Sequence, residues 1–288
     1  MYPAARIATT PISWGVVGGQ RWGVDLPTRR VLDEMTIAGF RATESGVPAF
    51  LPVDAVAARA MIDERNMRII AGAQSFILHD PAQAKGALDA TRLGAARLQA
   101  LGADVMMTVP KRGDLATGET LGADGWKHVF SMFRAVDDIL AEYDLKQALH
   151  PHVDSIVETK ADMTAVLEGC DVGWCFDSAH VASGGLDPVE FARTCQTITH
   201  FHLKDVELDL GKKMVDHEVG FNDAIKRGVF VSLGDGDLPI DQIVAAMSSR
   251  DDVWWVLEQD QAVPTTPADG EGPIKSVTRS LEYLETLR

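Results

Sequence analysis

Histidine and carboxylate side chains gather at the ends of four apolar segments in the second half of the chain. They are His150 and His152, Asp177 followed by His180, His200 and His202 followed by Lys204, and Glu258. Side chains two residues apart in a strand share a face, so a strand here would point His200, His202 and Lys204 the same way. Buried polar groups cost free energy unless they are paired or bind a metal. Imidazole and carboxylate ligands suit Mn²⁺, Co²⁺, Zn²⁺, Fe²⁺ or Mg²⁺, so the sequence predicts one divalent metal ion.

Each of these residues taken alone has a simpler use. A lone histidine at a strand end is usually a hydrogen-bonded core residue, and a lone carboxylate often caps a helix or pairs with a basic side chain. The repetition over four consecutive segments is what favours a metal site over these separate explanations.

Two side chains from earlier segments are expected near the same site. Glu44 ends an apolar segment and serves either as an acid, base or substrate contact or as a salt-bridge partner. Trp14 follows the first apolar segment and forms either an apolar wall against a sugar ring or part of the core. The sequence leaves both alternatives open.

Short apolar segments that alternate with longer amphipathic stretches would position these residues. The short segments, which we expect to be strands, are residues 7–12, 40–44, 67–76, 104–109, 147–152, 172–177, 198–204 and 253–258. The stretches with apolar residues at helical spacing include 28–38, 53–65, 82–101 and 126–143.

Strands that alternate with helices form parallel sheets, because parallel strands need crossover connections. Eight such units within 288 residues predict an α/β fold, a (β/α)₈ TIM barrel that occupies residues 1–288 as a single domain. In such barrels the chemistry gathers at the C-terminal ends of the strands. An open Rossmann-type sheet is the alternative, but Gly15, Gly18 and Gly19 lack the spacing of its nucleotide-binding turn.

Residues 206–238 form too long a connection for an ordinary strand–helix unit. Long loops of a barrel sit at the catalytic rim, so this segment is expected either to cover the C-terminal face as a lid or to decorate the surface.

Charge and composition limit the classes of molecule that this protein is expected to bind. The formal net charge of −15 argues against nucleic acid and against anionic membranes, and favours a small neutral or metal-chelated molecule. No apolar run approaches the roughly 18–20 residues of a membrane span, and the N-terminal residues do not resemble a secretory signal. Three cysteines without CxxC spacing fit a reducing compartment. The expected location is the cytoplasm.

Short motifs accompany these residues along nearly the whole chain. They are Pro11-Ile12-Ser13-Trp14-Gly15, Thr43-Glu44-Ser45-Gly46, His150-Pro151-His152 with Val157-Glu158-Thr159, Phe176-Asp177-Ser178-Ala179-His180 with Gly184-Gly185-Leu186-Asp187-Pro188, His202-Leu203-Lys204-Asp205, and Glu258. With these motifs the chain resembles the xylose-isomerase-like TIM barrels, a superfamily of sugar phosphate isomerases and epimerases. Within it the likeness is greatest to inosose dehydratase-like proteins, which remove water from a keto-inositol.

The resemblance implies a set of site residues. The metal ligands would be His150, Asp177, His202 and Glu258, with His152 close enough to compete with His150. The catalytic residues would be drawn from His180, Lys204, Glu44 and His152, and the substrate contacts from Trp14, Glu44, His180 and Lys204. The isomerases commonly carry Glu at the position of His150, whereas the dehydratase-like branch shares the histidine.

The resemblance also implies a reaction. Removing the proton next to a ketone builds negative charge on the carbonyl oxygen, and a divalent cation stabilises this enediolate. The implied activity is a metal-dependent carbon–oxygen lyase of inositol catabolism that acts on 2-keto-myo-inositol or a related cyclic keto-polyol. This chain departs from the residues usual in the family at Ser45, Val153-Asp154 and Ser178-Ala179. These positions are expected beside the pocket, so the departures point to a substrate that differs from inosose.

Three alternatives to this lyase stay open. They are a metal-dependent ketose or sugar phosphate isomerase or epimerase, an abasic-site endonuclease, and a non-catalytic sugar-binding protein. The −15 charge counts against the endonuclease. Barrels of this superfamily often pair, so a homodimer or homotetramer is also expected.

Overall fold

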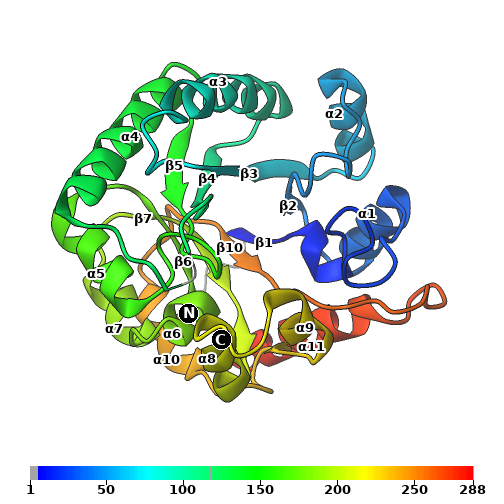
Figure 1. The fold of residues 1–288 in the computed structure, drawn as a ribbon. Coiled ribbons are helices and arrows are strands. Elements are labelled where there is room, and N and C mark those ends of the chain that lie inside the picture. The colour runs from blue at the N-terminus through cyan, green and yellow to red at the C-terminus, as the bar shows by residue number, and fades with distance from the viewer. Residues whose placement is uncertain (1–5, 117, 288) are drawn as a thin grey trace.

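The computed structural model describes residues 6–116 and 118–287 of the chain (Figure 1). Residues 1–5, 117 and 288 of the predicted 1–288 domain lie outside the described residues. A ring of helices surrounds a central set of strands, as expected for a barrel.

Eight parallel strands of the described residues close into a barrel in the order β1-β10-β7-β6-β5-β4-β3-β2. The strands are β1 (Ile7–Thr9), β2 (Ala42–Glu44), β3 (Arg68–Phe76), β4 (Val105–Pro110), β5 (Lys146–Leu149), β6 (Trp174–Asp177), β7 (Ile198–Leu203) and β10 (Trp255–Leu257). Six of the predicted strand segments contain one of these strands, and 104–109 and 147–152 overlap β4 and β5 with a difference of one residue at one end. The predicted TIM barrel is therefore confirmed, and the open-sheet alternative is wrong.

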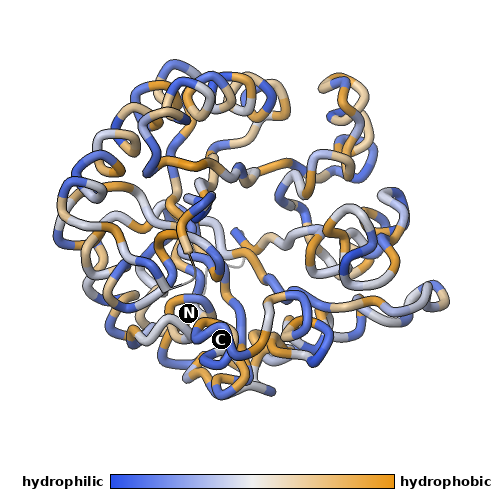
Figure 2. Tube along the Cα trace, in the orientation of Figure 1, coloured by the Kyte–Doolittle hydropathy of each residue, from blue (hydrophilic) through white to orange (hydrophobic). Residues whose placement is uncertain are grey.

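The helices lie outside the barrel, and their residues alternate between hydrophilic and hydrophobic (Figure 2). They are α1 (Thr28–Ile37), α2 (Ala55–Asp63), α3 (Ala84–Leu101), α4 (Ala123–Ala141), α5 (Lys160–Gly169), α6 (Ser178–Ser183), α7 (Pro188–Thr194), α8 (Leu208–Val215), α9 (Phe221–Lys226), α10 (Ile240–Met247) and α11 (Pro273–Glu285), with a 3₁₀ turn η2 (Pro11–Trp14) after β1.

The side chains of β7 show how the barrel separates its core from its site. Phe201 is fully buried against the outer layer, where its ring stacks on Phe176 at 4.9 Å and meets Trp255 edge-on at 5.1 Å. His200 and His202 alternate with it and point into the barrel, where they meet Glu44. The period of two in the sequence thus places aromatic rings under the helices and imidazoles inside the barrel.

The connection at residues 206–238 contains regular secondary structure and is not an irregular loop. Its two short strands, β8 (Asp205–Val206) and β9 (Phe230–Val231), pair antiparallel, and α8 and α9 lie between them. The Asp205 carboxylate organises the turn that follows by accepting hydrogen bonds from the backbone N–H groups of Gly234, Gly236 and Leu238.

None of the helices within residues 6–116 and 118–287 combines the length and the apolarity that a membrane crossing demands.

Candidate metal centre

Polar side chains from five strands converge at the C-terminal end of the barrel. All of them are buried, and they are Glu44, His150, Asp177, His200, His202, Lys204, Glu258 and Asp260. The parallel barrel brings them together because the carboxyl ends of all its strands meet at one rim.

The two carboxylate oxygens of Asp177 have different partners. Its Oδ1 accepts hydrogen bonds from the backbone N–H groups of Ala179 and His180, both at 2.9 Å, and so caps the N-terminus of α6. Its Oδ2 lies 3.4 Å from His150 Nε2 and 3.5 Å from His202 Nδ1. Burial opposes ionisation, but the Lys204 ammonium and the nearby imidazoles keep the pKa of Asp177 well below its ordinary value. A negatively charged oxygen therefore faces two imidazoles.

The two ring nitrogens of His202 lie in different surroundings. Its Nε2 donates to Glu44 Oε1 at 2.8 Å. Its Nδ1 lies 3.1 Å from Glu258 Oε2 but has no hydrogen-bond partner among the described residues. Burial works against a positive charge here, yet the surrounding Cys175, Glu258 and Glu44 raise the pKa of His202 well above its ordinary value. A divalent cation bound at Nδ1 would replace that proton, as metal binding to histidine generally does.

Glu44 accepts two imidazole N–H groups at one oxygen. His200 Nε2 and His202 Nε2 each lie 2.8 Å from Glu44 Oε1. Burial alone would raise the pKa of Glu44, but His202 and His200 lower it to well below its ordinary value. An ionised carboxylate behind a metal-ligating histidine fixes its tautomer and ring orientation. Glu44 therefore orients His202.

Lys204 lies among three carboxylates at the base of the site. Its Nζ is 3.3 Å from Asp177 Oδ2 and 3.0 Å from Asp260 Oδ2, and it donates a short hydrogen bond to Glu258. Burial disfavours the ammonium, but Asp177, Asp260 and Glu258 raise the pKa of Lys204 well above its ordinary value. Glu44 adds a fourth carboxylate, and burial raises the pKa of Glu258 and Asp260, so a further cation would be needed to keep all four ionised. The residues present thus fit a divalent cation.

The ligand atoms of Asp177, His202 and Glu258 lie within 4.8 Å of one another, as do those of His150, Asp177 and His180. His152 belongs to no such group of close ligand atoms in the described part of the chain. Its Nδ1 hydrogen bonds instead to the Val153 carbonyl at 2.7 Å. Between the two histidines that the sequence left open, the geometry favours His150 as the ligand.

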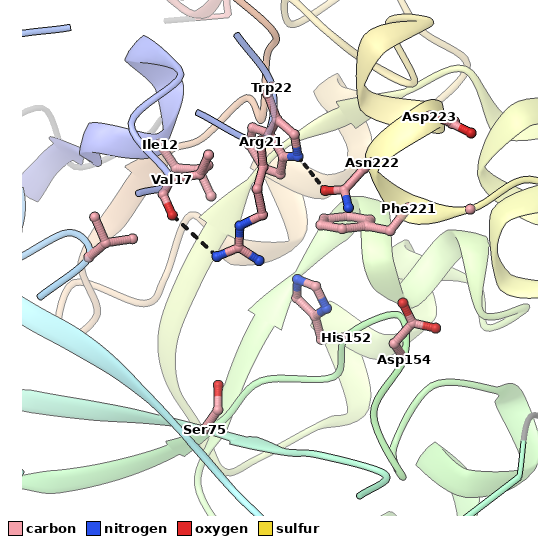
Figure 3. Close-up of a pocket in the computed structure, with 12 residues that line it drawn as sticks. Ile12, Val17, Arg21, Trp22, Ser75, His152, Asp154, Phe221, Asn222 and Asp223 are labelled. Atoms are coloured by element: carbon pink, nitrogen blue, oxygen red, sulfur yellow. Dashed lines mark hydrogen bonds between the residues drawn. The ribbon is translucent and has the colours of Figure 1, made fainter. Parts of the chain in front are cut away.

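Two neighbouring cavities that share lining residues border this site. The inner cavity, of about 270 Å³, is lined by Glu44, His150, His152, His202, Glu258 and Asp260 together with apolar side chains. The outer cavity, of about 700 Å³, shares Ile12, Val47, Ser75 and His152 with it (Figure 3). Phe221 and Asn222 of α9 also line the outer cavity, so the 206–238 segment borders the path to the site.

Three sequence-predicted substrate contacts do not line either cavity. Trp14 is fully buried, and its indole N–H donates to Glu34 in the core at 2.8 Å, which does not fit a role as a wall against substrate. Lys204 is sealed behind its carboxylates. His180 packs beside the His152 ring at 4.4 Å, and its Nε2 lacks a partner in the described residues.

One residue of the site, Asp260, was missed from the sequence, and the partner of another, His200, was not foreseen. Asp260 lines the inner cavity and binds Lys204, and its spacing of two residues from Glu258 is the signal that places both on one face. His200 was seen as part of the polar face, but its bond to Glu44 depends on a strand 156 residues away, which no local pattern reveals.

The comparisons with known proteins agree with the fold. A family model of xylose isomerase-like TIM barrels matches residues 32–287. The chain is 27% identical to the rhizopine catabolism protein MocC of Rhizobium meliloti, over 91% of this chain and 85% of that protein. It is 26% identical to an inosose dehydratase of Geobacillus kaustophilus, over 90% of this chain and 89% of that protein.

Solved structures repeat the same barrel. The IolI protein with a bound zinc atom has a TM-score of 0.72 at 15% identity, over 98% of this chain and 97% of that chain. An L-ribulose 3-epimerase has a TM-score of 0.72 at 14% identity, over 100% of this chain and 94% of that chain. At these identities the likeness extends to the fold alone.

Proposed function

The chain belongs to the xylose isomerase-like TIM barrel family, and we propose that it is a metal-dependent dehydratase of 2-keto-myo-inositol or a related cyclic keto-polyol. The relatives at 26–27% identity support this reaction class, because one of them is named an inosose dehydratase.

One observation carries the proposal. His202 Nδ1 lies between two buried carboxylates without a hydrogen-bond partner in the described chain, and the His202 side chain lines the inner cavity. His150, Asp177, His202 and Glu258 would hold the divalent cation. The cation would supply Lewis-acid stabilisation of the negative charge that develops on the substrate carbonyl oxygen.

His152 is the proposed base. The Val153 carbonyl accepts its Nδ1–H, so Nε2 carries the lone pair. Burial lowers the pKa of His152, which keeps the imidazole neutral at pH 7. Because His152 lines both cavities, a substrate in the inner cavity comes within its reach, and the proton that Nε2 takes from the carbon next to the carbonyl would leave with the departing hydroxyl as water.

Lys204 is proposed as a positioning residue rather than an acid at the substrate. Its ammonium holds Glu258 and Asp260 at the wall of the inner cavity. His180, which packs against His150 at 5.5 Å and against His152, supports the base from behind.

The test is turnover by metal-depleted protein reloaded with Mn²⁺, Co²⁺, Zn²⁺, Fe²⁺ or Mg²⁺. The proposal expects 2-keto-myo-inositol to give an enone absorbance only with metal, and His202→Ala to abolish it. His128→Ala on α4 is the matched control, which should behave as the wild type. Interconversion of keto-polyols or ketoses without enone absorbance would identify an isomerase or epimerase. No reaction with any of these metals would overturn the proposal.

A further inference from the structure

The outer cavity contains an arginine that the proposed chemistry does not use. Arg21 is the only lysine or arginine among the described residues that line this cavity. In Figure 3 its guanidinium extends from the loop after η2 into the cavity, toward His152. The outer cavity is larger than the inner one and shares four lining residues with it, so a ligand in the inner cavity that carries an added substituent could extend toward Arg21.

The loop that carries Arg21 is held in place by one carboxylate. Asp25 accepts hydrogen bonds from the backbone N–H groups of Val17 at 3.0 Å, Gly18 at 3.2 Å and Gln20 at 3.3 Å. Gly18 and Gly19 have φ values of 72° and 78°, a left-handed conformation that favours glycine. The backbone from which Arg21 projects is therefore built before any ligand arrives, which lowers the entropic cost of binding.

The guanidinium retains unused donors. Arg21 Nε and one terminal nitrogen donate to the Gly18 and Val17 carbonyls at 3.5 Å and 3.4 Å. The other terminal nitrogen has no protein acceptor within residues 6–116 and 118–287. These carbonyl contacts orient the planar group while they leave its positive charge uncompensated.

The charge of Arg21 is unpaired in an acidic protein. Arg21 forms no ion pair with any described residue, although Asp154 and Asp223 line the same cavity. The inner cavity, by contrast, has three carboxylates and no lysine or arginine in its described lining. Among the described residues that line the two cavities, Arg21 is therefore the one lysine or arginine that could pair with a negative group on a ligand.

We propose that Arg21 binds an anionic group, a phosphate or a carboxylate, on a substrate whose polyol part occupies the inner cavity. Guanidinium binds both oxyanions through paired hydrogen bonds, so the shared chemistry fits either source. The inference rests on the proposed function only for the keto-polyol part. It makes the preferred substrate an anionic relative of 2-keto-myo-inositol.

The test is calorimetric binding of three pyranoses that differ in one group: glucose, glucose 6-phosphate and glucuronate. The wild-type protein should bind one of the anions about tenfold or more tightly than glucose. Arg21→Gln should abolish that ratio, and Arg21→Lys should retain part of it. The sugar that shows the preference identifies the source as phosphate or carboxylate.

Arg29→Gln is the matched control, because Arg29 lies on α1 with a side chain that is 67% exposed and paired with Glu64. It should keep the wild-type ratio. Equal or undetectable binding of all three sugars by the wild type, or an unchanged ratio in Arg21→Gln with a wild-type melting temperature, would overturn the inference.

Failure of this inference and failure of the proposed function are distinguishable, because binding needs no turnover. If the protein prefers an anionic sugar through Arg21 but dehydrates no keto-polyol, only the proposed function is refuted. Dehydration of 2-keto-myo-inositol by the wild type, combined with an Arg21-independent ratio, removes only the anion site.

Discussion

Glu44 is expected to set the metal affinity of this site without touching the metal. It accepts the Nε2–H of His202, and this bond leaves Nδ1 free to face Asp177 and Glu258. Glu44→Gln keeps the size of the side chain but removes its negative charge. The His202 imidazole then loses a strong hydrogen-bond acceptor at Nε2. It also loses the negative charge of Glu44, which makes Nδ1 a better electron donor to the metal.

The expected loss follows from the geometry. Replacing a partner that hydrogen bonds to a metal-ligating histidine typically weakens metal binding about 10–100-fold, which corresponds to about 1.4–2.7 kcal/mol. The Glu44 contact should lie within this range, because its 2.8 Å bond is buried and charged. Competition between the protein and a chromogenic chelator for Co²⁺ would measure the affinity.

Glu34→Gln is the control for this measurement. Glu34 is also a buried carboxylate, and it binds the Trp14 indole at 2.8 Å and Arg30 at 2.9 Å, away from the metal ligands. It should lower stability while leaving Co²⁺ affinity unchanged. A Glu44→Gln affinity within about twofold of the wild type, or an equal loss in Glu34→Gln, would refute this role of Glu44.

Three further outcomes are expected. Phe201→Ala should lower the free energy of unfolding by about 3–5 kcal/mol, because it empties the stack between Phe176 and Trp255; a loss below about 1 kcal/mol in urea unfolding would contradict this packing. Burial raises the pKa of Glu158 from 4.5 to about 7, so the folded state binds the proton more tightly and loses stability as pH rises through that window. The melting temperature of Glu158→Gln should therefore rise relative to that of the wild type between about pH 4.5 and 7. A difference in melting temperature that stays constant over this range would contradict the raised pKa of Glu158. His152→Asn should lower kcat about 10²–10⁴-fold while Co²⁺ affinity stays at the wild-type value, and joint loss of both would make His152 a ligand instead of a base.

The barrel was readable from the sequence because its signals are local. Short apolar segments, helical spacing and the alternation at 200–203 depend only on near neighbours in the chain. The same alternation placed His200 and His202 on one face of their strand. Strand ends of a parallel barrel share one rim, so a gathering of ligands at that rim could also be expected.

The pairing of side chains within the site was not readable. Lys204 meets Asp177, Glu258 and Asp260, and the last two lie more than 50 positions further along the chain. Trp14 turns into the core because Glu34 offers its indole an acceptor. Such partners depend on the register and closure of the barrel, which the period of a strand does not encode.

The most direct measurement of the central claim is an anomalous-scattering map from a crystal of the protein loaded with Mn²⁺, Co²⁺ or Zn²⁺. We expect one strong peak in contact with His202 Nδ1, His150, Asp177 Oδ2 and Glu258. A peak elsewhere, a peak at His152 in place of His150, or no peak from fully loaded protein would contradict it.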